Sequence, residues 1–382
     1  MEWKLKDLTV DEKGSYGIGA PAVPYQENKL TYLRITDIND DGSLNFSDLK
    51  SVDAEDAEKY ILKENDIVFA RTGNSTGRSY FYEKQHGTFV YAGFLIKFSL
   101  DPNKVNPRIM KYYTHSKPYF DWVNSFDTGA TRGNINAKTY GDMEIELPSR
   151  KVQDKIVAIL SSLDRKIELN NKINADLEEM AQAIFKNWFV DFEPFKDGKF
   201  VDSELGMIPE GWKVGCLGDI AEITSGKRPP KKSKDKTKEL FIPLIGASDI
   251  MGFTSDVLYE RPILVIGRVG THGVVQRFQE KCWPSDNTLV VESSYYNYVY
   301  QLLKGIDYSA INRGSTQPLI TQTDVKNTDV IIAPENVLKE YESITSTLFS
   351  KHRANIKESS RLSLLRDTLL PRLMSGELEV PE

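Results

Sequence analysis

The sequence predicts an α+β protein: two similar mixed α/β domains at opposite ends of an antiparallel two-helix coiled coil, related as a pseudo-two-fold internal repeat. Two observations support this fold class, namely two long stretches with heptad spacing and a repeat of the segments that precede them. We expect a first domain over residues 1–148, a central long helix over 149–190, a linker over 191–211, a second domain over 212–333, a C-terminal long helix over 334–375 and a tail over 376–382.

The central helix is predicted from seam residues spaced alternately four and three apart. No glycine or proline interrupts residues 149–187, and Ser149 is suited to cap the N-terminus of the helix. The seam consists of Ile156, Leu160, Leu163, Ile167, Asn170, Asn174, Leu177, Ala181 and Ile184. A single helix of this kind would expose its apolar stripe, so it requires a partner.

The partner is predicted in the same chain, over residues 336–370. Its seam is Tyr341, Ile344, Leu348, Lys351, Asn355, Glu358, Leu362, Leu365 and Leu369. The pattern permits parallel pairing, but the connecting segment would then have to run back along the whole helix, so connectivity favours antiparallel pairing. That arrangement sets Asn170 opposite Asn355, and buried polar residues at such places usually fix the register. The alternative is two unrelated surface helices on separate cores.

The composition is that of a soluble globular protein of two or three domains, with 40% hydrophobic and 27% charged residues among 382. No apolar run approaches the length of a membrane span, and residues 1–4 do not resemble a signal peptide. Two cysteines, Cys216 and Cys282, provide no disulfide framework, so we expect a cytoplasmic protein. The net charge of −6 argues weakly against nucleic acid, although local basic patches matter more.

The first domain is predicted to mix strands and helices. We expect strands over Leu30–Ile38, Asp66–Ala70 and Phe89–Ser99, and a helix over Pro107–Asn124. An aromatic segment, Trp188 to Phe195, follows the first long helix and begins the linker.

The second domain repeats the first. Trp3-Lys4-Leu5 and Asp7-Leu8 match Trp212-Lys213-Val214 and Asp219-Ile220; the apolar run 67–73 matches 264–270; and Gly129-Ala130-Thr131-Arg132 matches Gly314-Ser315-Thr316-Gln317. Similar scaffolds with different loops indicate one task performed on two different targets. The alternative is an old duplication kept only for packing.

No catalytic signature is present. The sequence lacks a GxxxxGK[ST] phosphate loop, a GxGxxG fingerprint and the Asn-Pro-Pro-Tyr motif usual in adenine methyltransferases. The four histidines, His86, His115, His272 and His352, are isolated and do not have zinc-ligand spacing. We therefore expect no catalytic residue and no metal ligand in this chain.

Binding signals are stronger. A segment rich in arginine, glycine and hydroxyl side chains follows an apolar strand at residues 71–78 and has a counterpart at 268–273; its backbone N–H groups and guanidinium groups suit phosphates and guanine edges. Asparagine and glutamine in the segments that follow suit adenine edges. The predicted DNA-binding residues outside the basic segment are Arg71, Thr72, Asn74, Ser75, Arg78, Arg132, Asn134, Asn136, Arg268, Thr271, His272, Arg313, Ser315, Thr316 and Gln317. Glycine turns with solvated arginines and ordinary turn formers are the alternative interpretation.

Residues 226–238 contain seven basic residues and one acid. We expect a mobile basic arm that follows a phosphate backbone, with Lys227, Arg228, Lys231, Lys232 and Lys234 as DNA-binding residues. A solvated loop without function is the alternative.

The chain resembles the specificity subunits of type I restriction-modification systems over nearly its whole length. The resemblance rests mainly on residues 157–174 and 183–192, with Pro209-Glu210-Gly211-Trp212, Gly314-Ser315-Thr316-Gln317 and Leu364 to Pro371 in support. It implies two target recognition domains that each read half of a split DNA sequence, and two long helices that separate them and dock two modification subunits.

The resemblance also implies which cofactors the partners bring. S-adenosylmethionine would be bound by the modification subunits, which methylate adenine N6, while ATP and Mg would be used by restriction subunits; the specificity subunit itself is non-catalytic. A stand-alone DNA-modifying enzyme and a coiled-coil scaffold without a DNA role are the alternative functions.

Overall fold

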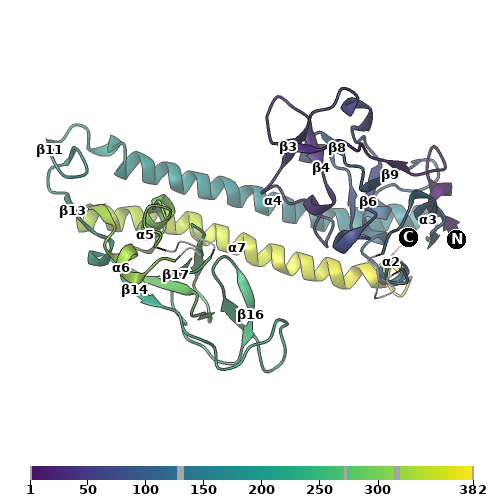
Figure 1. Ribbon diagram of the computed structural model, residues 1–382. Helices are drawn as coiled ribbons and strands as arrows, with labels where there is room; N and C mark the ends of the chain where they lie inside the picture. The colour runs from purple at the N-terminus through teal and green to yellow at the C-terminus, as the bar shows by residue number, and fades with distance from the viewer. Residues whose placement is uncertain (1, 127–132, 271–272, 314–318, 381–382) are drawn as a thin grey trace. The chain divides into compact units, whose positions relative to one another are not determined.

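A computed structural model describes residues 2–126, 133–270, 273–313 and 319–380. The chain forms two compact units: unit 1 comprises residues 1–169 and 358–382, and unit 2 comprises residues 170–357. Two 40-residue helices, α4 (Arg150–Phe189) and α7 (Glu335–Met374), are divided between the units, so each helix has one part in unit 1 and the other in unit 2. The remaining elements form one mixed α/β domain in each unit (Figure 1).

Unit 1 contains three small sheets. One is an antiparallel sheet in the order β2-β9-β6-β7, one is a mixed sheet in the order β3-β5-β4-β8 with β4 and β8 parallel, and the third pairs β1 with β10. The strands are β1 (Glu2–Lys4), β2 (Ser15–Tyr16), β3 (Ala22–Pro24), β4 (Thr31–Leu33), β5 (Lys50–Val52), β6 (Asp66–Ala70), β7 (Ser79–Phe81), β8 (Phe89–Tyr91), β9 (Leu95–Ser99) and β10 (Glu144–Glu146), and the helices are α1 (Ile109–Tyr113), α2 (Lys117–Asn124) and α3 (Ala137–Gly141).

Unit 2 repeats this topology. Its antiparallel sheet has the order β14-β20-β17-β18, its mixed sheet the order β16-β15-β19 with β15 and β19 parallel, and β13 pairs with β21. The elements are β11 (Phe200–Val201), β12 (Ile208–Pro209), β13 (Lys213–Cys216), β14 (Glu222–Ser225), β15 (Ile242–Ile245), β16 (Ile250–Thr254), β17 (Ile263–Gly267), β18 (Val275–Phe278), β19 (Trp283–Pro284), β20 (Thr288–Glu292), β21 (Asp329–Ile332), α5 (Tyr296–Gly305) and α6 (Gln322–Lys326).

The strand register corrects one part of the predicted repeat. Asp7 and Asp219 occupy equivalent positions, because each accepts a hydrogen bond from the backbone three residues earlier. Trp3 lies opposite Ile145, whereas the equivalent strand position in unit 2 holds Gly215, opposite Val330. The match of Trp3 with Trp212 was therefore wrong: Trp212 precedes its strand and packs on Phe189 and Phe192 instead.

Three of the predicted elements are shorter than expected. The predicted strand Leu30–Ile38 is β4 followed by a 3-10 turn at Ile35–Asp37, which Asp37 stabilises by accepting from the backbone N–H of Arg34. The predicted strand Phe89–Ser99 is β8 and β9 separated by a turn, and the predicted helix Pro107–Asn124 is α1 and α2 separated at Thr114–Ser116. The strand predicted over Asp66–Ala70 is confirmed as β6, which is buried along its whole length.

In unit 2, α4 and α7 meet through a buried amide pair. Asn355 Nδ2 donates to Asn174 Oδ1 over 2.9 Å, and both residues are at least nine-tenths buried. The sequence predicted Asn170 at this position, so the observed hydrogen bond lies one helical turn away, although Asn170 is itself fully buried. The helices run antiparallel here, since Tyr341 Oη also reaches the carbonyl of Ala181.

In unit 1 the two helices meet through a buried carboxylate. Asp164 of α4 accepts from Arg366 of α7 at 3.1 Å and from Tyr112 of α1 at 3.0 Å, and lies 3.1 Å from Lys111 Nζ. Burial alone would raise the pKa of Asp164, but Lys111 and Arg366 hold it below its ordinary value. This carboxylate therefore joins α1, α4 and α7.

The seam predicted for α7 is partly wrong. Tyr341 and Asn355 are buried as expected, but Ile344 and Leu365 are 40% and 45% exposed, and the buried position after Tyr341 is Thr345. Thr345 donates its hydroxyl to the carbonyl of Tyr341 at 2.8 Å, which satisfies the group inside the helix. Apolarity favours Ile344 over Thr345 as a seam residue, because the sequence pattern does not reveal the hydrogen bond that satisfies the Thr345 hydroxyl.

The aromatic segment Trp188 to Phe195, predicted to begin the linker, packs into the core of unit 2. Phe189 and Phe192 of this segment are at most 9% exposed, as is Trp212 after the linker, and Phe189 also contacts Tyr298 and Tyr341 with ring centroids 4.6 and 5.1 Å apart. Aromatic burial of this size contributes strongly to stability. Within the described residues, no helix combines the length and the apolarity needed to cross a membrane.

Replacing Asp164 with Asn should reduce the free energy of unfolding at pH 7 by roughly 2–4 kcal/mol, because Lys111 and Arg366 lose their buried counter-charge. A carboxylate with a lowered pKa stabilises the folded state above its unfolded pKa of about 3.9, and this contribution is lost as the pH falls through the folded value. The difference between wild type and the variant should therefore shrink as the pH is lowered from about 4, as measured by urea denaturation. Asp121→Asn, in the exposed pair with Lys117, serves as control and should change little.

Candidate nucleic-acid interface

Each unit places an arginine directly after its buried central strand. Arg71 follows β6 and Arg268 follows β17, and each begins a turn that we call the arginine turn, residues 71–73 in unit 1 and 268–270 in unit 2. Gly73 and Gly270 close these turns with φ of 74° and 83°, a left-handed conformation that favours glycine. The two turns are therefore the same structural device.

The same hydrogen bonds surround both turns. The backbone N–H of Arg71 donates to Phe94 O at 3.1 Å and that of Arg268 donates to Asn287 O at 2.9 Å. The Arg71 carbonyl accepts from Ile135 N at 2.9 Å, and the Arg268 carbonyl accepts from Ile320 N at 3.0 Å. Each arginine turn thus lies against a segment from later in its domain, residues 134–135 in unit 1 and 319–320 in unit 2. The isolated bridges Thr72–Asn134 and Val269–Leu319 show the same pairing.

The described contacts include no hydrogen bond and no ion pair of the Arg71 or Arg268 guanidinium group. The Nε atoms of Arg71 and Arg268 are buried and have no hydrogen-bond partner among the described residues. Arg71 also stacks over the ring of Tyr16, with its Cζ 5.1 Å from the ring centroid. The Nε atoms are buried, so the terminal N–H groups of these half-buried side chains are the ones that suit phosphate or a guanine edge.

The other predicted residues of segment 71–78 differ in their availability. Asn74 is exposed, whereas Ser75 is buried. Arg78 is engaged within the domain, since it donates to Asp40 at 2.7 Å and to the carbonyl of Ile38 at 3.0 Å. Of the two arginines predicted in this segment, Arg71 is therefore the one free to bind.

In the following motifs, several polar residues have structural roles. Asn136 caps α3 by accepting from Thr139 N at 2.9 Å, and Arg313 forms an ion pair with Asp324. Burial would raise the pKa of Asp324, but hydrogen bonds from Thr321 and Arg313 lower it. Asn134 is exposed and unconstrained by such a role. The predicted residues Arg132, Thr271, His272, Ser315, Thr316 and Gln317 lie outside the described residues.

The basic segment is anchored rather than free. This basic loop, residues 226–238, is fixed at its start because Lys227 N donates to Pro284 O and Trp283 Nε1 donates to Lys227 O. Ser233 exchanges two backbone hydrogen bonds with Phe253 of β16, at 2.9 and 2.8 Å. The predicted cations Lys227, Arg228, Lys231, Lys232 and Lys234 are all exposed, and no ion pair involving them occurs in the described part of the chain. An anchored row of unpaired cations corrects the expectation of a mobile arm.

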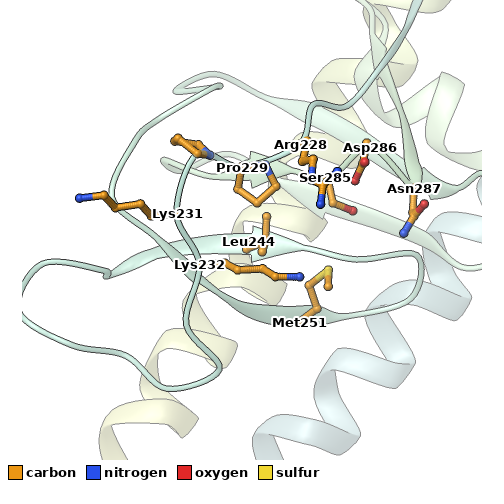
Figure 2. A pocket seen from close by; sticks show the side chains of 10 residues that line it. Arg228, Pro229, Lys231, Lys232, Leu244, Met251, Ser285, Asp286 and Asn287 are labelled. Atoms are coloured by element: carbon orange, nitrogen blue, oxygen red, sulfur yellow. The ribbon is translucent and has the colours of Figure 1, made fainter.

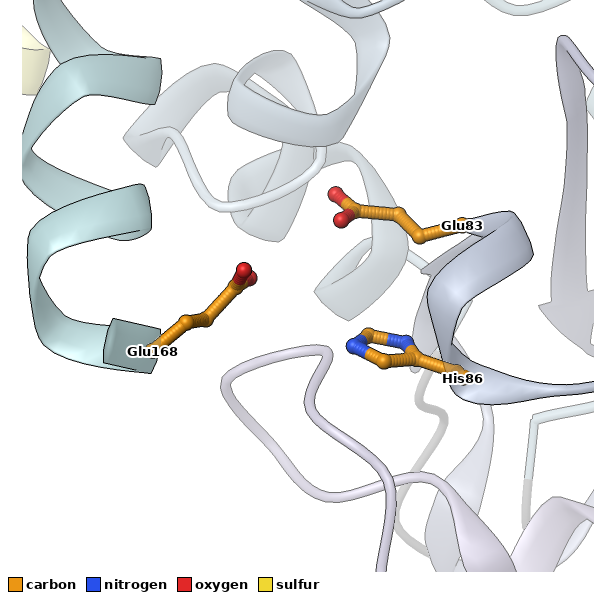
Figure 3. Close-up of side chains that lie close together, drawn as sticks. All are labelled: Glu83, His86 and Glu168. Atoms are coloured by element: carbon orange, nitrogen blue, oxygen red, sulfur yellow. The ribbon is translucent and has the colours of Figure 1, made fainter. Parts of the chain in front are cut away.

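One histidine lies with two carboxylates in unit 1. Glu83, His86 and Glu168 have ligand atoms within 4.8 Å of one another (Figure 3). Arg108 and Lys111 both donate to Glu83 at 2.9 Å, and His86 Nδ1 lies 3.0 Å from Tyr80 Oη. Although burial acts to raise it, these cations lower the pKa of Glu83. Glu168 is 82 positions from His86 (168−86), so motif spacing could not reveal this grouping. Arg108 and Lys111 already balance the charge of Glu83, and these cations would repel a metal ion at the same place.

The fold and the interface define a class: a duplicated domain that presents an arginine turn twice, as a protein reading two similar but different nucleic-acid sites would do. The family model described as the type I restriction modification DNA specificity domain matches residues 3–179 and again residues 209–358. The chain therefore belongs to the type I restriction-modification specificity (S) subunits, as the sequence resemblance predicted.

Curated relatives agree with this assignment. The MjaIX specificity subunit of Methanocaldococcus jannaschii is 32% identical over 299 residues, covering 71% of this chain and 69% of the relative. The HindI specificity subunit of Haemophilus influenzae is 23% identical over 408 residues, covering 84% and 88%. A crystal structure of the type I S subunit from M. genitalium shares the fold, with a TM-score of 0.61 at 16% identity over 100% of this chain and 96% of that one.

The different states of Arg71 and Arg78 generate a prediction. Arg71→Gln should flatten the dependence of log binding constant on log salt by about one unit of slope, because one phosphate contact is lost. Arg78→Gln removes the same charge but breaks only the contacts to Asp40 and Ile38, so the slope should remain that of wild type. Filter binding to duplex DNA across a salt series measures both variants. Equal effects of the two substitutions would show that net charge alone, and not the arginine turn, governs binding.

Proposed function

We propose that this specificity subunit recognises a bipartite DNA target, with the domain of each unit reading one half. The observation that carries this proposal is the repeated set of hydrogen bonds around Arg71 and Arg268 combined with different surrounding loops. Equivalent hydrogen bonds would hold the two arginine turns in the same way against a duplex, and different side chains would give different base preferences. An old duplication kept only for packing would not need two arginines at equivalent positions that form no ion pair within the described residues.

The two long helices act as a spacer in this proposal. Both run 40 residues without a break, which corresponds to about 60 Å at ~1.5 Å per residue. As an antiparallel coiled coil they would hold the two domains at opposite ends and separate the two half-sites by roughly a helical turn of DNA or more. The buried pairs Asn174–Asn355 and Asp164–Arg366 support a single register for this spacer.

The helices also offer docking surfaces for two modification subunits. Leu364 is 69% exposed, and Leu365, Ile356, Ile344, Met180 and Leu169 are each at least 40% exposed, on helices whose other exposed residues are mostly polar. Exposed apolar side chains in such surroundings mark protein contacts. Restriction subunits would join the same complex.

Chemistry resides on the partners in this proposal. The modification subunits would bind S-adenosylmethionine and methylate adenine N6, and the restriction subunits would use ATP and Mg; this chain would contribute recognition only. Highly purified protein should neither methylate nor cut DNA, and addition of a cognate modification subunit should give sequence-specific adenine methylation.

A domain exchange tests the two-reader proposal. Replacing residues 212–333 with the equivalent domain of a homologue should change one half of the methylated sequence and leave the other half unchanged, because each unit has its own core and its own arginine turn. Methylation mapping of the reconstituted complex gives the result. A change in both halves would refute separate readers.

Lengthening both helices tests the spacer. Four residues inserted near Asn174 and four near Asn355 add about 6 Å of rise and about 400° of turn, a net rotation of roughly 40°. On DNA these correspond to about two base pairs of rise and about one of rotation. We expect the spacer between half-sites to grow by one or two base pairs while both half-sites stay the same.

Insertion in one helix alone is the control for this test. It breaks the register of the seam, so activity should be lost with the fold. An active double-insertion variant that keeps its original spacer would show that another element sets the distance.

A further inference from the structure

A short loop differs between the two units at an equivalent position. We call it the triplet loop: residues 92–94 in unit 1 and 285–287 in unit 2. Leu95 N donates to Ala92 O at 2.8 Å and Thr288 N donates to Ser285 O at 3.0 Å, so both loops close in the same way. The last residue of each accepts from the arginine turn, as described above for Arg71 and Arg268. On this shared backbone, unit 1 presents Ala-Gly-Phe and unit 2 presents Ser-Asp-Asn.

The backbone that crosses each triplet loop is equally close in both units. A Cβ on Gly17 would meet the carbonyl oxygen of Ala92 at 2.3 Å, and a Cβ on Gly226 would meet that of Ser285 at 2.1 Å. After these glycines the chains diverge. Unit 1 continues to β3, which pairs with β5. Unit 2 continues into the basic loop, whose Ser233 pairs with Phe253 of β16, the counterpart of β5.

In unit 2 the triplet loop and the basic loop line an open-sided cavity of about 520 Å³ (Figure 2). Arg228, Lys231 and Lys232 line it from the basic loop, and Ser285, Asp286 and Asn287 line it from the triplet loop. Pro229, Leu244 and Met251 supply apolar wall. Gly252 permits this arrangement, because a Cβ there would lie 2.4 Å from Ser233 O.

The polar side chains of the unit 2 triplet loop have no partner among the described residues. Ser285 is 2% exposed, yet its Oγ has no hydrogen-bond partner among the described residues. The side chains of Asp286 and Asn287 are exposed, and the described contacts include none for either side chain. A buried hydroxyl without a partner is costly unless a ligand or water satisfies it.

An acid among unpaired cations has a specific use in a DNA-binding surface. A carboxylate repels phosphate, so Asp286 does not serve backbone binding. It can accept a hydrogen bond from an exocyclic amino group, which cytosine and adenine present in the major groove. The cations of the basic loop can hold the adjacent phosphates at the same time.

We propose that the triplet loop is the base-reading element of each unit, and that in unit 2 Asp286, Asn287 and Ser285 select a base carrying an exocyclic amino group while the basic loop holds its phosphate. This inference rests on the proposed DNA-recognition function and assigns residues to it. In unit 1, Gly93 and Phe94 stand where unit 2 has Asp286 and Asn287. Phe94 is 59% exposed and can contact only apolar base edges such as the thymine methyl group or a base face. The two triplets therefore select different bases from the same backbone position.

The test uses the full chain reconstituted with a modification subunit, followed by methylation mapping. The domain exchange first identifies the half-site that belongs to unit 2. Asp286→Asn should then reduce the preference for cytosine or adenine at one position of that half-site by about fivefold to 100-fold, and Asn287→Ala should relax the same or the neighbouring position. The other half-site should not change.

Glu239→Gln is the matched control, because Glu239 is exposed next to the basic loop, carries the same charge and does not line the cavity. It should leave the methylated sequence unchanged. Ser285→Ala gives a third measurement, and thermal unfolding confirms that all variants fold.

Two outcomes distinguish failure of this inference from failure of the proposed DNA-recognition function. If wild type directs sequence-specific methylation but Asp286→Asn, Asn287→Ala and Ser285→Ala all keep its sequence preference, the triplet loop is not the reader and the inference fails alone. If wild type directs no sequence-specific methylation, the proposed function itself fails.

Discussion

The register of the two long helices depends on polar groups that are buried in the seam. A buried amide or carboxylate left without a partner costs about 1–3 kcal/mol or more, so Asn174–Asn355 and Asp164–Arg366 can form only when the helices are correctly aligned. Apolar residues alone would accept neighbouring registers at small cost. Carboxylates of α4 also attach other elements of each unit to the helices: Tyr112 donates to Asp164 in unit 1, and Tyr300 donates to Glu178 at 3.1 Å in unit 2.

Duplication gives the protein two copies of a positioning device and the freedom to vary what each copy presents. The hydrogen bonds around the arginine turns involve backbone atoms, so they place few demands on side-chain identity. Side chains at the triplet loops and the loops after Gly17 and Gly226 can therefore differ without disturbing the fold. The residues that position the domain on DNA are thus different from those that select the bases. This division suits DNA recognition, in which phosphate contacts fix the position of the protein and base contacts read the sequence.

The sequence predicted the features that depend on local pattern. Long helices, the buried strand Asp66–Ala70 and the repeat around Arg71 and Arg268 all follow from periodicity or from short motifs. It failed where distant residues decide the outcome. Thr345 can be buried because its hydroxyl bonds within the helix, and the aromatic segment Trp188 to Phe195 is part of the core because Tyr298 and Tyr341 lie beside Phe189.

The candidate site shows the same division. Motif composition identified Arg71 and the basic loop, but not that Asp40 engages Arg78 or that Asn136 caps a helix. Those partners lie in other segments or in local geometry that composition does not encode. The triplet loop was missed for a related reason: Ser285-Asp286-Asn287 reads as an ordinary turn until strand pairing places it beside the arginine turn.

Charge distribution explains how a chain of net charge −6 can present a DNA-binding surface. Beyond about 8–10 Å, salt screens exposed charges, so the net charge of the whole chain has little influence at the interface. What matters is which cations are paired. In unit 1, carboxylates form ion pairs with Lys111, Arg366 and Arg78. In unit 2, no ion pair is described for the three cations that line the cavity, Arg228, Lys231 and Lys232. The exposed cations of the basic loop can therefore contact phosphates whatever the net charge of the chain, and because phosphate contacts carry no sequence information, discrimination is left to the base-reading residues.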